Sequence, residues 1–335
     1  KLGVAYATSG PGATNLITGI CDAFFDSIPT IFITGQVNTF ESRGQYAVRQ
    51  RGFQETDIVS MVAPITKYAK RVESAEKIRY YLDTAFTLAT SGRMGPALLD
   101  IPMNVFRAEI EPDKLYKADR LTNLSHSDTI SSIVGVLKNA LQESEHPCCL
   151  IGNGVKITKA QGDIISFCHR FKIPMITSMI AFDVVGNDSL NYGFIGAYGD
   201  RAANFIVAKS DLLISLGSRL DVRQVGAKRE NFAPNAKIIR FDVDEGELDY
   251  SVHQDEIKCC VGMQETVQAL KIIEKTCTSD YSKWIDICNE IREKLETVDQ
   301  SRTGKIVEAL SKKFPEDVLI TTDVGQNQVW VAQSV

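Results

Sequence analysis

The chain has 335 residues, 44% hydrophobic and 24% charged, and its 37 basic and 42 acidic side chains give a net charge of −5. At about 100 to 200 residues per domain, this length predicts about two domains, and the composition is typical of folded proteins. Because positive charge is not in excess, we exclude nucleic acid and acidic membrane surfaces as partners. No apolar run reaches the roughly 18 residues of a membrane helix and no signal pattern is present, so we expect a cytoplasmic protein.

Cysteine and histidine spacing argues against a metal site. The eight cysteines include no C-x-x-C pair, and none of the four histidines has a second ligand-type residue at metal spacing. We therefore expect buried thiols in a reducing compartment and no metal bound within this chain.

Apolar runs of strand length alternate with amphipathic segments of helix length along most of the chain. This alternation is typical of βαβ units and predicts an α/β fold with parallel, doubly wound sheets. In the first block, Gly10-Pro11-Gly12 interrupts the pattern directly after a strand. The elements expected in this block are a strand at 3–8, a helix at 13–25, a strand at 29–34, a helix near 75–91 and a strand at 97–101.

A polar stretch at about 106–128 lacks strong periodicity and predicts an interdomain linker. A second doubly wound block follows, and then a charged helix at 279–300 whose apolar residues recur at spacings of three and four, which predicts one packed face. That face consists of Tyr281, Trp284, Ile287, Ile291 and Leu295. The elements expected in the second block are helices at 129–142, 159–171 and 201–208 and strands at 148–151, 174–177, 211–216 and 237–242.

A third block begins near residue 304. It offers a helix at 304–313, a strand at 317–322 and the start of a turn at 323–326. One strand and one helix cannot form a sheet domain, and the first block starts directly on a strand. We therefore expect both ends of the chain to lie inside domains of a longer protein.

The first candidate binding loop runs from Ser9 to Asn15, with the sequence SGPGATN. It joins a strand to a helix, so it lies at the carboxyl edge of a parallel sheet, where open α/β folds bind ligands. Its glycines let a ligand approach the backbone, and the N–H groups at the helix start offer hydrogen bonds. The alternative is a tight turn without a ligand.

A second candidate loop, Gly52-Phe53-Gln54-Glu55, follows the unusual run Arg49-Gln50-Arg51. A neutral amide beside an aromatic ring suits the orientation of an uncharged ligand or a carbonyl group. The alternative is a solvated loop with one anchoring phenylalanine.

Small residues recur at strand ends in the second block. Gly152-Asn153-Gly154 and Gly217-Ser218-Arg219 each end a strand, and three further glycines at 193, 196 and 199 precede a helix. Such ends could together cradle a diphosphate, and Asp242 closes another strand where a carboxylate can accept ribose hydroxyls. The pattern favours a dinucleotide site; glycines that only make turns are the alternative.

Arg219 and Arg223 flank Asp221 at a spacing of two. If the segment is extended, all three side chains lie on one side and could hold an anionic group. The alternative is a surface ion-pair cluster of little energetic value.

The order of these motifs resembles the large subunit of acetolactate synthase and its relatives among the thiamine-diphosphate (ThDP) enzymes. The resemblance spans nearly the whole chain. It is carried by SGPGATNLITGICDAFFDSIPTIFITGQV, GFQETDIV, PITKYAKRV, SGRMGPALLDIP, LISLGSRLDVR, FAPNAKIIRFDVD and TDVGQNQVWVAQ.

The resemblance implies a three-domain subunit that is represented here in part. ThDP is expected between two subunits, so it implies a homodimer or homotetramer, with FAD in the central domain and a possible regulatory subunit. The implied divisions are a pyrimidine-binding part at 1–108, a linker at 109–128, a central nucleotide-binding domain at 129–276, a connecting helix at 277–303 and the start of a diphosphate-binding domain at 304–335.

The resemblance also assigns residues. Phe53 and Gln54 match an active-site pair near the reacting carbons, and Arg223 matches an arginine that meets the second 2-keto acid. Positions that match ThDP contacts are Pro11, Asn15, Gly325, Gln326 and Asn327. Positions that match FAD contacts are Arg93, Gly152, Asn153, Gly154, Thr177, Ser178, Gly217, Ser218, Arg219, Asp242 and Val243.

The implied reaction removes carbon dioxide from a 2-keto acid, first of all pyruvate, and joins the remaining fragment to a second carbonyl. The glutamate that activates the cofactor is expected before Lys1 and the Mg²⁺ ligands after Val335. We therefore expect no Mg²⁺ ligands in this chain and no turnover by the chain as given.

Four positions depart from the usual acetolactate synthase pattern. Lysine is usual at Met103, methionine at Ala197, aspartate at Val222, and Gly-Thr-Asp at Arg49-Gln50-Arg51. They leave open a related decarboxylase or carboligase with another acceptor, and a non-catalytic nucleotide-binding module is a further alternative. A hydride-transferring Rossmann enzyme is disfavoured because no G-x-G-x-x-G follows the first strand.

Overall fold

The computed structural model describes residues 2–118, 127–296, 302–315 and 318–334. It divides into two compact units, Lys1–Leu124 and Ser125–Val335, here called unit 1 and unit 2. Residues 119–126, within the expected linker, lie outside the described residues. Each unit contains one sheet, and every strand pair described in it is parallel, which confirms the predicted α/β class.

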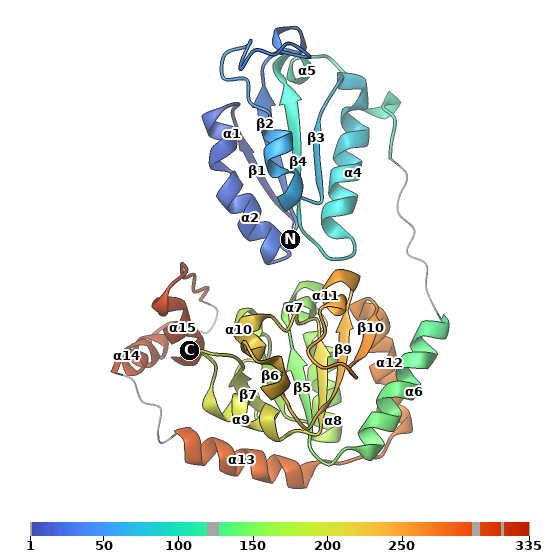
Figure 1. Ribbon diagram of the computed structural model, residues 1–335, viewed down its shortest axis with the longest axis vertical. Helices are drawn as coiled ribbons and strands as arrows, with labels where there is room; N and C mark the ends of the chain where they lie inside the picture. The colour runs from blue at the N-terminus through green and yellow to red at the C-terminus, as the bar shows by residue number, and fades with distance from the viewer. Residues whose placement is uncertain (1, 119–126, 297–301, 316–317, 335) are drawn as a thin grey trace. The chain divides into compact units, whose positions relative to one another are not determined.

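Unit 1 is built on a four-stranded sheet with helices on both faces (Figure 1). Its helices and strands are β1 (Gly3–Ala7), α1 (Pro11–Asn15), α2 (Ile17–Phe25), β2 (Thr30–Gln36), α3 (Ile58–Val62), β3 (Tyr68–Arg71), α4 (Ile78–Thr90), β4 (Pro96–Pro102) and α5 (Met103–Phe106). The strand order is β1-β2-β4-β3, and β4 is buried throughout. Side chains alternate along a strand, so Leu98 packs into the core cluster that includes α2 and α3, and Leu99 into the cluster that includes α4.

Besides the short helices α3 and α5, which the sequence does not predict, two features of unit 1 differ from the expectations. The helix expected at 13–25 is two helices, because α1 begins at Pro11, whose missing N–H suits a first helical turn, and Leu16 separates α1 from α2. The sequence does not predict β3, because Tyr-Ala-Lys-Arg lacks the apolar run of a buried strand. β3 lies at the sheet edge beside β4.

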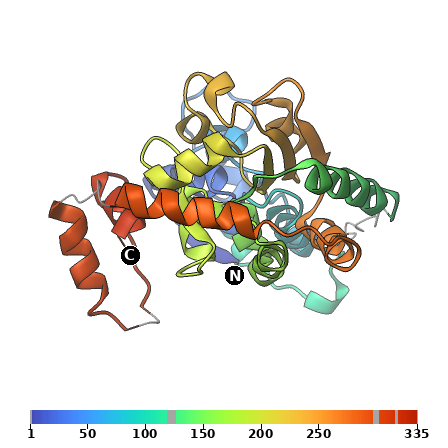
Figure 2. The ribbon, with the colours of Figure 1, turned by 90° about the horizontal axis from the view of Figure 1, so that it is seen from below.

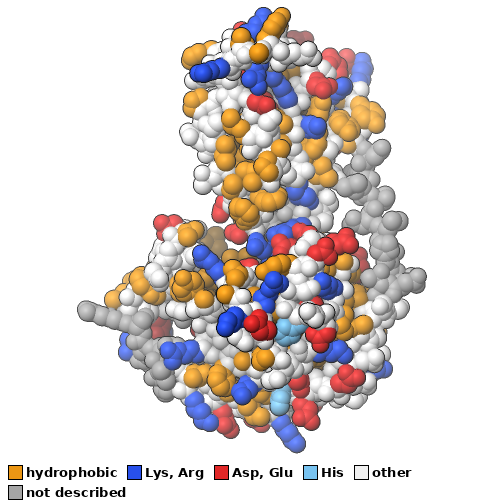
Figure 3. All heavy atoms as spheres, in the orientation of Figure 1, with side chains coloured by type: hydrophobic (Ala, Val, Ile, Leu, Met, Phe, Trp, Pro, Cys, Tyr) orange, Lys and Arg blue, Asp and Glu red, His pale blue; other side chains and the backbone are white. Residues whose placement is uncertain are grey.

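β1 forms the other edge of this sheet and carries exposed apolar side chains. Val4 and Tyr6 are 62% and 85% exposed, and Phe25 at the end of α2 is 56% exposed. Figure 3 shows hydrophobic side chains gathered on this face of unit 1. Among the residues described, no strand pairs with the outer edge of β1.

Unit 2 has a six-stranded parallel sheet in the order β10-β9-β8-β5-β6-β7. Its strands are β5 (Pro147–Ile151), β6 (Met175–Thr177), β7 (Asn191–Phe194), β8 (Leu212–Leu216), β9 (Lys237–Asp242) and β10 (Ile257–Cys260). Its helices up to residue 296 are α6 (Ser127–Glu143), α7 (Asn153–Thr158), α8 (Gln161–Phe171), α9 (Arg201–Lys209), α10 (Val222–Val225), α11 (Glu245–Asp249), α12 (Met263–Thr276) and α13 (Ser282–Glu296). The chain runs outward from β5 through β6 to β7, and then returns to β8 on the other side of β5. The order of the strands therefore reverses at β5 and β8, which is where open α/β sheets form a crevice at their carboxyl edge.

Besides the short helices α7, α10 and α11, the sequence does not predict three elements of unit 2. β7 has the sequence Asn-Tyr-Gly-Phe, in which Gly193 has φ +94°, and β10 is only half buried. Both are short edge strands, so neither carries the continuous apolar run that reveals a central strand. The third is α12, which packs against α6 and α8.

Helix α13 packs against the rest of unit 2 and lies along α9 (Figure 2). The Trp284 indole Nε1–H donates to the Pro147 carbonyl at 3.0 Å, and the Tyr281 hydroxyl bonds the Leu141 carbonyl. The expected packed face is wrong at Ile287, which is 44% exposed, whereas Cys288 is fully buried. The helix is therefore rotated so that Cys288 faces the core.

The described part of the third block contains α14 (Arg302–Ser311) and α15 (Gln326–Ser334). The strand expected at 317–322 is wrong, since residues 318–322 form no strand and Leu319 is 92% exposed. A single strand has no partner for its backbone hydrogen bonds. Residue 317 itself lies outside the described residues.

Two further observations concern the cysteines and membrane spans. Cys148, Cys149, Cys168, Cys277 and Cys288 are buried, as expected, whereas Cys260 is exposed. In the parts of the chain that are described, no helix has both the length and the apolar character needed to cross a bilayer.

Candidate functional site

The two candidate loops of unit 1 meet at the carboxyl edge of its sheet. Gly10 caps α1 with φ +63°, and a Cβ built on it would lie 2.8 Å from Gln54 Cβ and 3.0 Å from the Gln54 carbonyl oxygen. Both the backbone conformation and this contact require glycine. The structure thus brings the SGPGATN loop against the Phe53-Gln54 segment, which lies more than 40 residues further along the chain.

Residues Gly52 to Glu55 form a tight turn, closed by a hydrogen bond of 3.2 Å from the Glu55 N–H to the Gly52 carbonyl. Its third residue, Gln54, has φ +59°, a left-handed conformation that glycine or asparagine usually takes at such a position. Phe53 is 86% exposed. Left-handed backbone at a residue other than glycine concentrates at functional sites, and the turn presents one exposed ring beside one strained amide residue.

Residues 42–52 form a loop that carries Arg43, Arg49 and Arg51, here called the arginine-containing loop. The Glu55 carboxylate accepts hydrogen bonds from both ends of this loop. Oε1 accepts from the Ser42 hydroxyl and the Arg43 N–H, each at 2.8 Å, and Oε2 accepts from the Arg51 N–H at 3.1 Å and the Gly52 N–H at 3.4 Å. Burial acts to raise the pKa of Glu55, but these hydrogen bonds outweigh it and hold the pKa below its usual value. Glu55 is therefore a carboxylate.

A buried polar group anchors the other side of the turn. The Gln36 amide donates to the Thr56 carbonyl at 2.8 Å and to Asp100 Oδ2 at 3.0 Å, and the Thr34 hydroxyl donates to Asp100 Oδ1 at 2.7 Å. Thr34 and Asp100 are register partners on β2 and β4. Burial raises the pKa of Asp100, although these two hydrogen bonds oppose the shift.

The residues matched to the aminopyrimidine lie on α1. Pro11 is its first residue and Asn15 its last, and both are exposed. Residues four apart share one face of a helix, so both lie on the same side of α1. Arg93, matched to FAD, also belongs to unit 1, where its Nε donates to the Ser27 hydroxyl at 3.0 Å.

In unit 2, the ends of β5 and β8 lie in backbone contact at the point where the strand order reverses. The Gly152 N–H donates to the Leu216 carbonyl at 2.9 Å and the Gly154 N–H to the Gly217 carbonyl at 3.1 Å. A Cβ on Gly152 would lie 2.1 Å from the Gly217 oxygen. These glycines are therefore required by each other, whether or not a ligand is bound. Helices α7, α10 and α11 each begin just after a strand of this edge (Figure 1).

Buried hydroxyl groups without partners lie beside these glycines. Thr177 and Ser178, at the end of β6, are 1% and 2% exposed, and neither Oγ1 of Thr177 nor Oγ of Ser178 has a hydrogen-bond partner among the described residues. The Ser178 N–H donates to the Ile151 carbonyl at 2.9 Å, which fixes this strand end next to Gly152. Buried hydroxyls are normally hydrogen-bonded, so these residues fit a polar ligand such as the FAD that the resemblance implies.

Two further residues matched to FAD, Ser218 and Asp242, form hydrogen bonds within the protein. Ser218 is buried, and its hydroxyl donates to Gln224 Oε1 at 2.9 Å. Asp242, at the end of β9, accepts from the Asp244 N–H at 3.0 Å, and Val243 after it is exposed. Asn153 is the first residue of α7.

The grouping of Arg219, Asp221 and Arg223 on one extended side is wrong. Asp221 caps α10, its Oδ1 accepts the Arg223 N–H at 2.8 Å, and Arg223 is helical. Arg219 instead pairs with Glu247, with Nε and Oε1 3.6 Å apart. A helix start changes the side-chain period from 2 to 3.6 residues, so the two arginines diverge.

Sequence reasoning missed the buried pair of Arg240 and Glu256. Arg240 is 1% exposed, and its Nη1 lies 3.1 Å from Glu256 Oε1. Its Nη2 donates to the carbonyls of Arg219 at 3.2 Å and Glu247 at 3.0 Å. An arginine inside the apolar strand sequence KIIRFD is the signal that could have revealed it.

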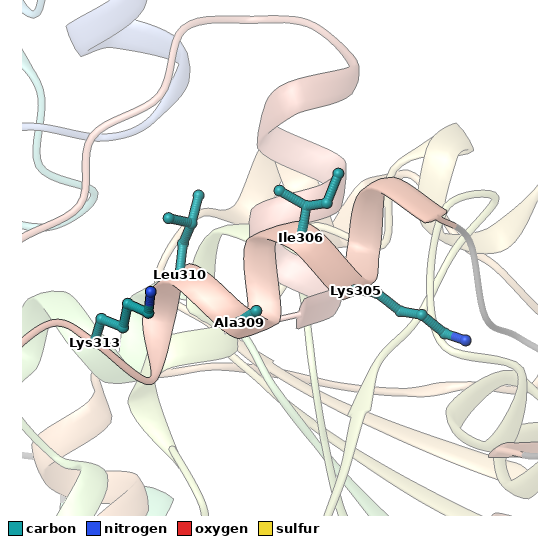
Figure 4. Close-up of a pocket in the computed structure, with 5 residues that line it drawn as sticks. All are labelled: Lys305, Ile306, Ala309, Leu310 and Lys313. Carbon is teal, nitrogen blue, oxygen red and sulfur yellow. The ribbon is translucent and has the colours of Figure 1, made fainter.

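The last block holds Gly325, Gln326 and Asn327 at the start of α15, all exposed, with the Asn327 amide bonded to the Asp323 carboxylate. An open pocket of about 370 Å³ lies on α14 instead (Figure 4). It is lined by Lys305, Ile306, Ala309, Leu310 and Lys313, none of which is a candidate site residue.

Two family models match the chain. Residues 1–61 match the thiamine pyrophosphate enzyme N-terminal TPP binding domain, and residues 136–270 match the thiamine pyrophosphate enzyme central domain. Together they cover more than half of the chain. The chain belongs to the thiamine pyrophosphate enzymes. The suspected family is thereby confirmed.

Curated relatives of this thiamine pyrophosphate enzyme are acetolactate synthase subunits. The chain is 31% identical to the acetolactate synthase large subunit of Parasynechococcus marenigrum, over 99% of this chain and 54% of the relative. It is 34% identical to the acetolactate synthase isozyme 2 large subunit of Escherichia coli, over 100% of this chain and 59% of the relative. The chain thus spans a little over half the length of these relatives.

The matched ranges contain most of the candidate site residues. Pro11, Asn15, Phe53 and Gln54 fall within the N-terminal match, and the unit 2 residues from Gly152 to Val243 fall within the central match. Arg93 and the turn at 325–327 fall outside both. The roles of the individual residues stay predictions.

Proposed function

We propose that this thiamine pyrophosphate enzyme acts in the ThDP-dependent decarboxylation of a 2-keto acid, with pyruvate as the first candidate, and joins the remaining fragment to a second carbonyl. The observation that carries the proposal is the contact between Gly10 and the left-handed Gln54. Similarity to acetolactate synthase large subunits along the whole chain supports it.

Each unit 1 residue has a definite part in this proposal. When bound, ThDP supplies a nucleophilic carbon and an electron sink for decarboxylation. Pro11 and Asn15, on one face of α1, would hold the aminopyrimidine side of the cofactor. The Gln54 amide would donate a hydrogen bond to the substrate carbonyl, and the exposed Phe53 ring would shield the bound substrate from water.

For unit 2, we propose FAD at the crevice between β5 and β8. The backbone N–H groups after Gly152 and Gly217 would face the diphosphate, and Asp242 would accept a ribose hydroxyl. The unpartnered hydroxyls of Thr177 and Ser178 would supply hydrogen bonds to the flavin nucleotide. We assign no reaction step to the flavin.

We also propose a cytoplasmic homodimer or homotetramer that uses Mg²⁺ and associates with a regulatory subunit. The relatives are named as large subunits, which supports a smaller partner. The division into domains at 1–108, 129–276 and 304–335, joined by 109–128 and 277–303, belongs to the same proposal.

Cofactor titration tests the proposal directly. We expect the purified full-length gene product to bind ThDP only with Mg²⁺ in calorimetry and to show flavin absorbance near 450 nm. Loss of ThDP binding on Gln54→Ala is not expected, because that residue serves the substrate. A full-length protein that binds no ThDP at millimolar concentration contradicts the proposal.

A specific observation favours a second candidate, a carboligase whose acceptor differs from pyruvate. The loop beside Phe53 carries the exposed arginines Arg49 and Arg51, and Met103 at the start of α5 is 41% exposed. The two added arginines in this loop would favour a more anionic acceptor, and the loss of the usual lysine at Met103 would change the charge and volume at that position. Mass spectrometry of the products formed from competing acceptors separates the two candidates.

A further inference from the structure

We propose that Glu55 is the positioning residue of this site, and that its carboxylate ties down the arginine-containing loop so that Gln54 keeps its left-handed conformation against Gly10. The inference rests on the proposed function, because it gives Gln54 a substrate to orient. It adds a residue to which none of the candidate roles above has been assigned.

The Glu55 carboxylate holds both ends of the arginine-containing loop. One carboxylate takes four hydrogen bonds, two from the start of the loop, at Ser42 and Arg43, and two from its end, at Arg51 and Gly52. It therefore closes the loop at its base. The Arg51 guanidinium adds a hydrogen bond to the Ser42 carbonyl at 3.2 Å across the same base.

Glu55 also brings negative charge to a segment that contains several arginines. Glu55 is the only acidic residue between Ser42 and Thr56, a stretch that contains Arg43, Arg49 and Arg51. Its carboxylate therefore places one negative charge in a stretch with three positive ones and also bonds backbone N–H groups. A neutral amide at this position keeps the shape but loses the charge, and only one of its two terminal atoms can accept.

Hydrogen bonds on both sides of Gln54 hold its backbone in place. Glu55 follows Gln54 directly, and its N–H closes the turn to Gly52. On the far side, the buried Gln36 amide holds the Thr56 carbonyl at 2.8 Å. Gln54 is thus strained between two anchors, and a left-handed residue persists only where its surroundings fix it. Releasing the Glu55 anchor lets Gln54 relax away from Gly10.

The experiment uses the full-length protein with Glu55→Gln and the matched control Glu73→Gln. Glu73 is a carboxylate of the same unit that pairs with Lys77 at 2.9 Å on the surface, outside the loop. Hydrogen–deuterium exchange of a peptide covering residues 42–52 is measured together with kcat and KM for pyruvate. We expect exchange to accelerate about tenfold and kcat to fall by about 10- to 100-fold in Glu55→Gln, with KM nearly unchanged, and no change in the control.

A double-mutant cycle with Gln54→Ala separates positioning from general stability. If Glu55 acts through Gln54, then Glu55→Gln lowers kcat much less in the Gln54→Ala background than alone. Additive losses would overturn the proposal, as would exchange in Glu55→Gln equal to that of the control. Should Glu55→Gln fail to fold, Ser42→Ala removes one bond to Oε1 and should give a smaller effect in the same direction.

The two hypotheses fail in different ways. If the unmodified protein releases no carbon dioxide from any 2-keto acid, the proposed function is wrong, and the exchange measurement still decides whether Glu55 holds the loop. If the protein is active and Glu55→Gln matches the control in both measurements, only the role of Glu55 is wrong.

Discussion

Gln54 stores backbone strain at the point where the two candidate loops of unit 1 touch. A left-handed residue other than glycine costs on the order of 1 to 3 kcal/mol. Glycine would take the same backbone conformation without this cost. The strained position therefore differs from glycine in carrying a side-chain amide. If Gln54 has the proposed role, this one residue costs stability in order to keep an amide at the site.

Gln54→Gly should increase the free energy of unfolding by between zero and about 1 kcal/mol, because glycine adopts φ +59° without strain. It should also lower kcat, since the amide is lost. Urea unfolding and steady-state kinetics measure the two effects. Gln50→Gly, at an exposed loop position without positive φ, is the control and should gain no stability. A loss of more than 1 kcal/mol in Gln54→Gly would contradict the strain.

The pH dependence of the arginine-containing loop follows from Glu55. Its pKa is lowered because hydrogen bonds to the carboxylate outweigh burial. The folded loop thus favours the charged form, so the stabilisation is complete above the usual pKa near 4.5 and is lost as pH falls through the lowered value. Exchange protection of residues 42–52, corrected for intrinsic rates, should stay level from pH 7 to 5 and fall only below about 4.5. Protection that already falls between pH 7 and 5 would argue against this assignment.

Arg240 and Glu256 form a fully buried pair, with 1% and 0% of their side chains exposed. Arg240→Met leaves Glu256 buried without its partner and should cost about 3 to 5 kcal/mol, whereas adding Glu256→Leu should recover most of that loss. Urea unfolding of the single and double variants measures these changes. A double variant no more stable than Arg240→Met would show that the pair is not the cause.

At the level of elements, central strands are the most predictable ones, although the sequence also predicts the largely exposed edge strand β1. β4, β5 and β8 are buried along their whole length, so their apolar runs show in the sequence. The edge strands β3, β7 and β10 are short and half-buried, and their existence depends on a neighbouring strand. The strand expected at 317–322 is wrong for a related reason. Among the described residues, no strand lies beside this apolar run, so its backbone has no strand to pair with.

The carboxyl ends of the paired strands β5 and β8 approach too closely for side chains at the proposed nucleotide site. Gly217 has φ +60°, and a Cβ on it would lie 2.8 Å from Gly154 Cα. Gly217→Ala should therefore destabilise unit 2 by about 1 to 3 kcal/mol and abolish flavin retention. Gly162→Ala, in α8 with open space around it, is the matched control and should be neutral or stabilising. Flavin absorbance per subunit and the unfolding midpoint are measured for both variants. A yellow, stable Gly217→Ala protein would show that the contact between the two strand ends does not require glycine.

For the whole molecule, the sequence predicts where the site lies better than what holds it. Gly10 and the Phe53-Gln54 pair are visible because they interrupt local patterns. Thr34, Gln36 and Asp100 carry no such signal, since 64 to 66 residues separate the partners and only the pairing of β2 with β4 brings them together. The contact between the two loops depends on tertiary structure in the same way.

The decarboxylation itself is the most direct test of the proposed function. The measurement is carbon dioxide release from pyruvate by the full-length gene product, with and without ThDP and Mg²⁺. We predict release that requires both cofactors, is accompanied by a carboligation product and falls sharply in Gln54→Ala. No cofactor-dependent release from pyruvate or any other 2-keto acid, from a folded protein that has bound ThDP, would contradict it.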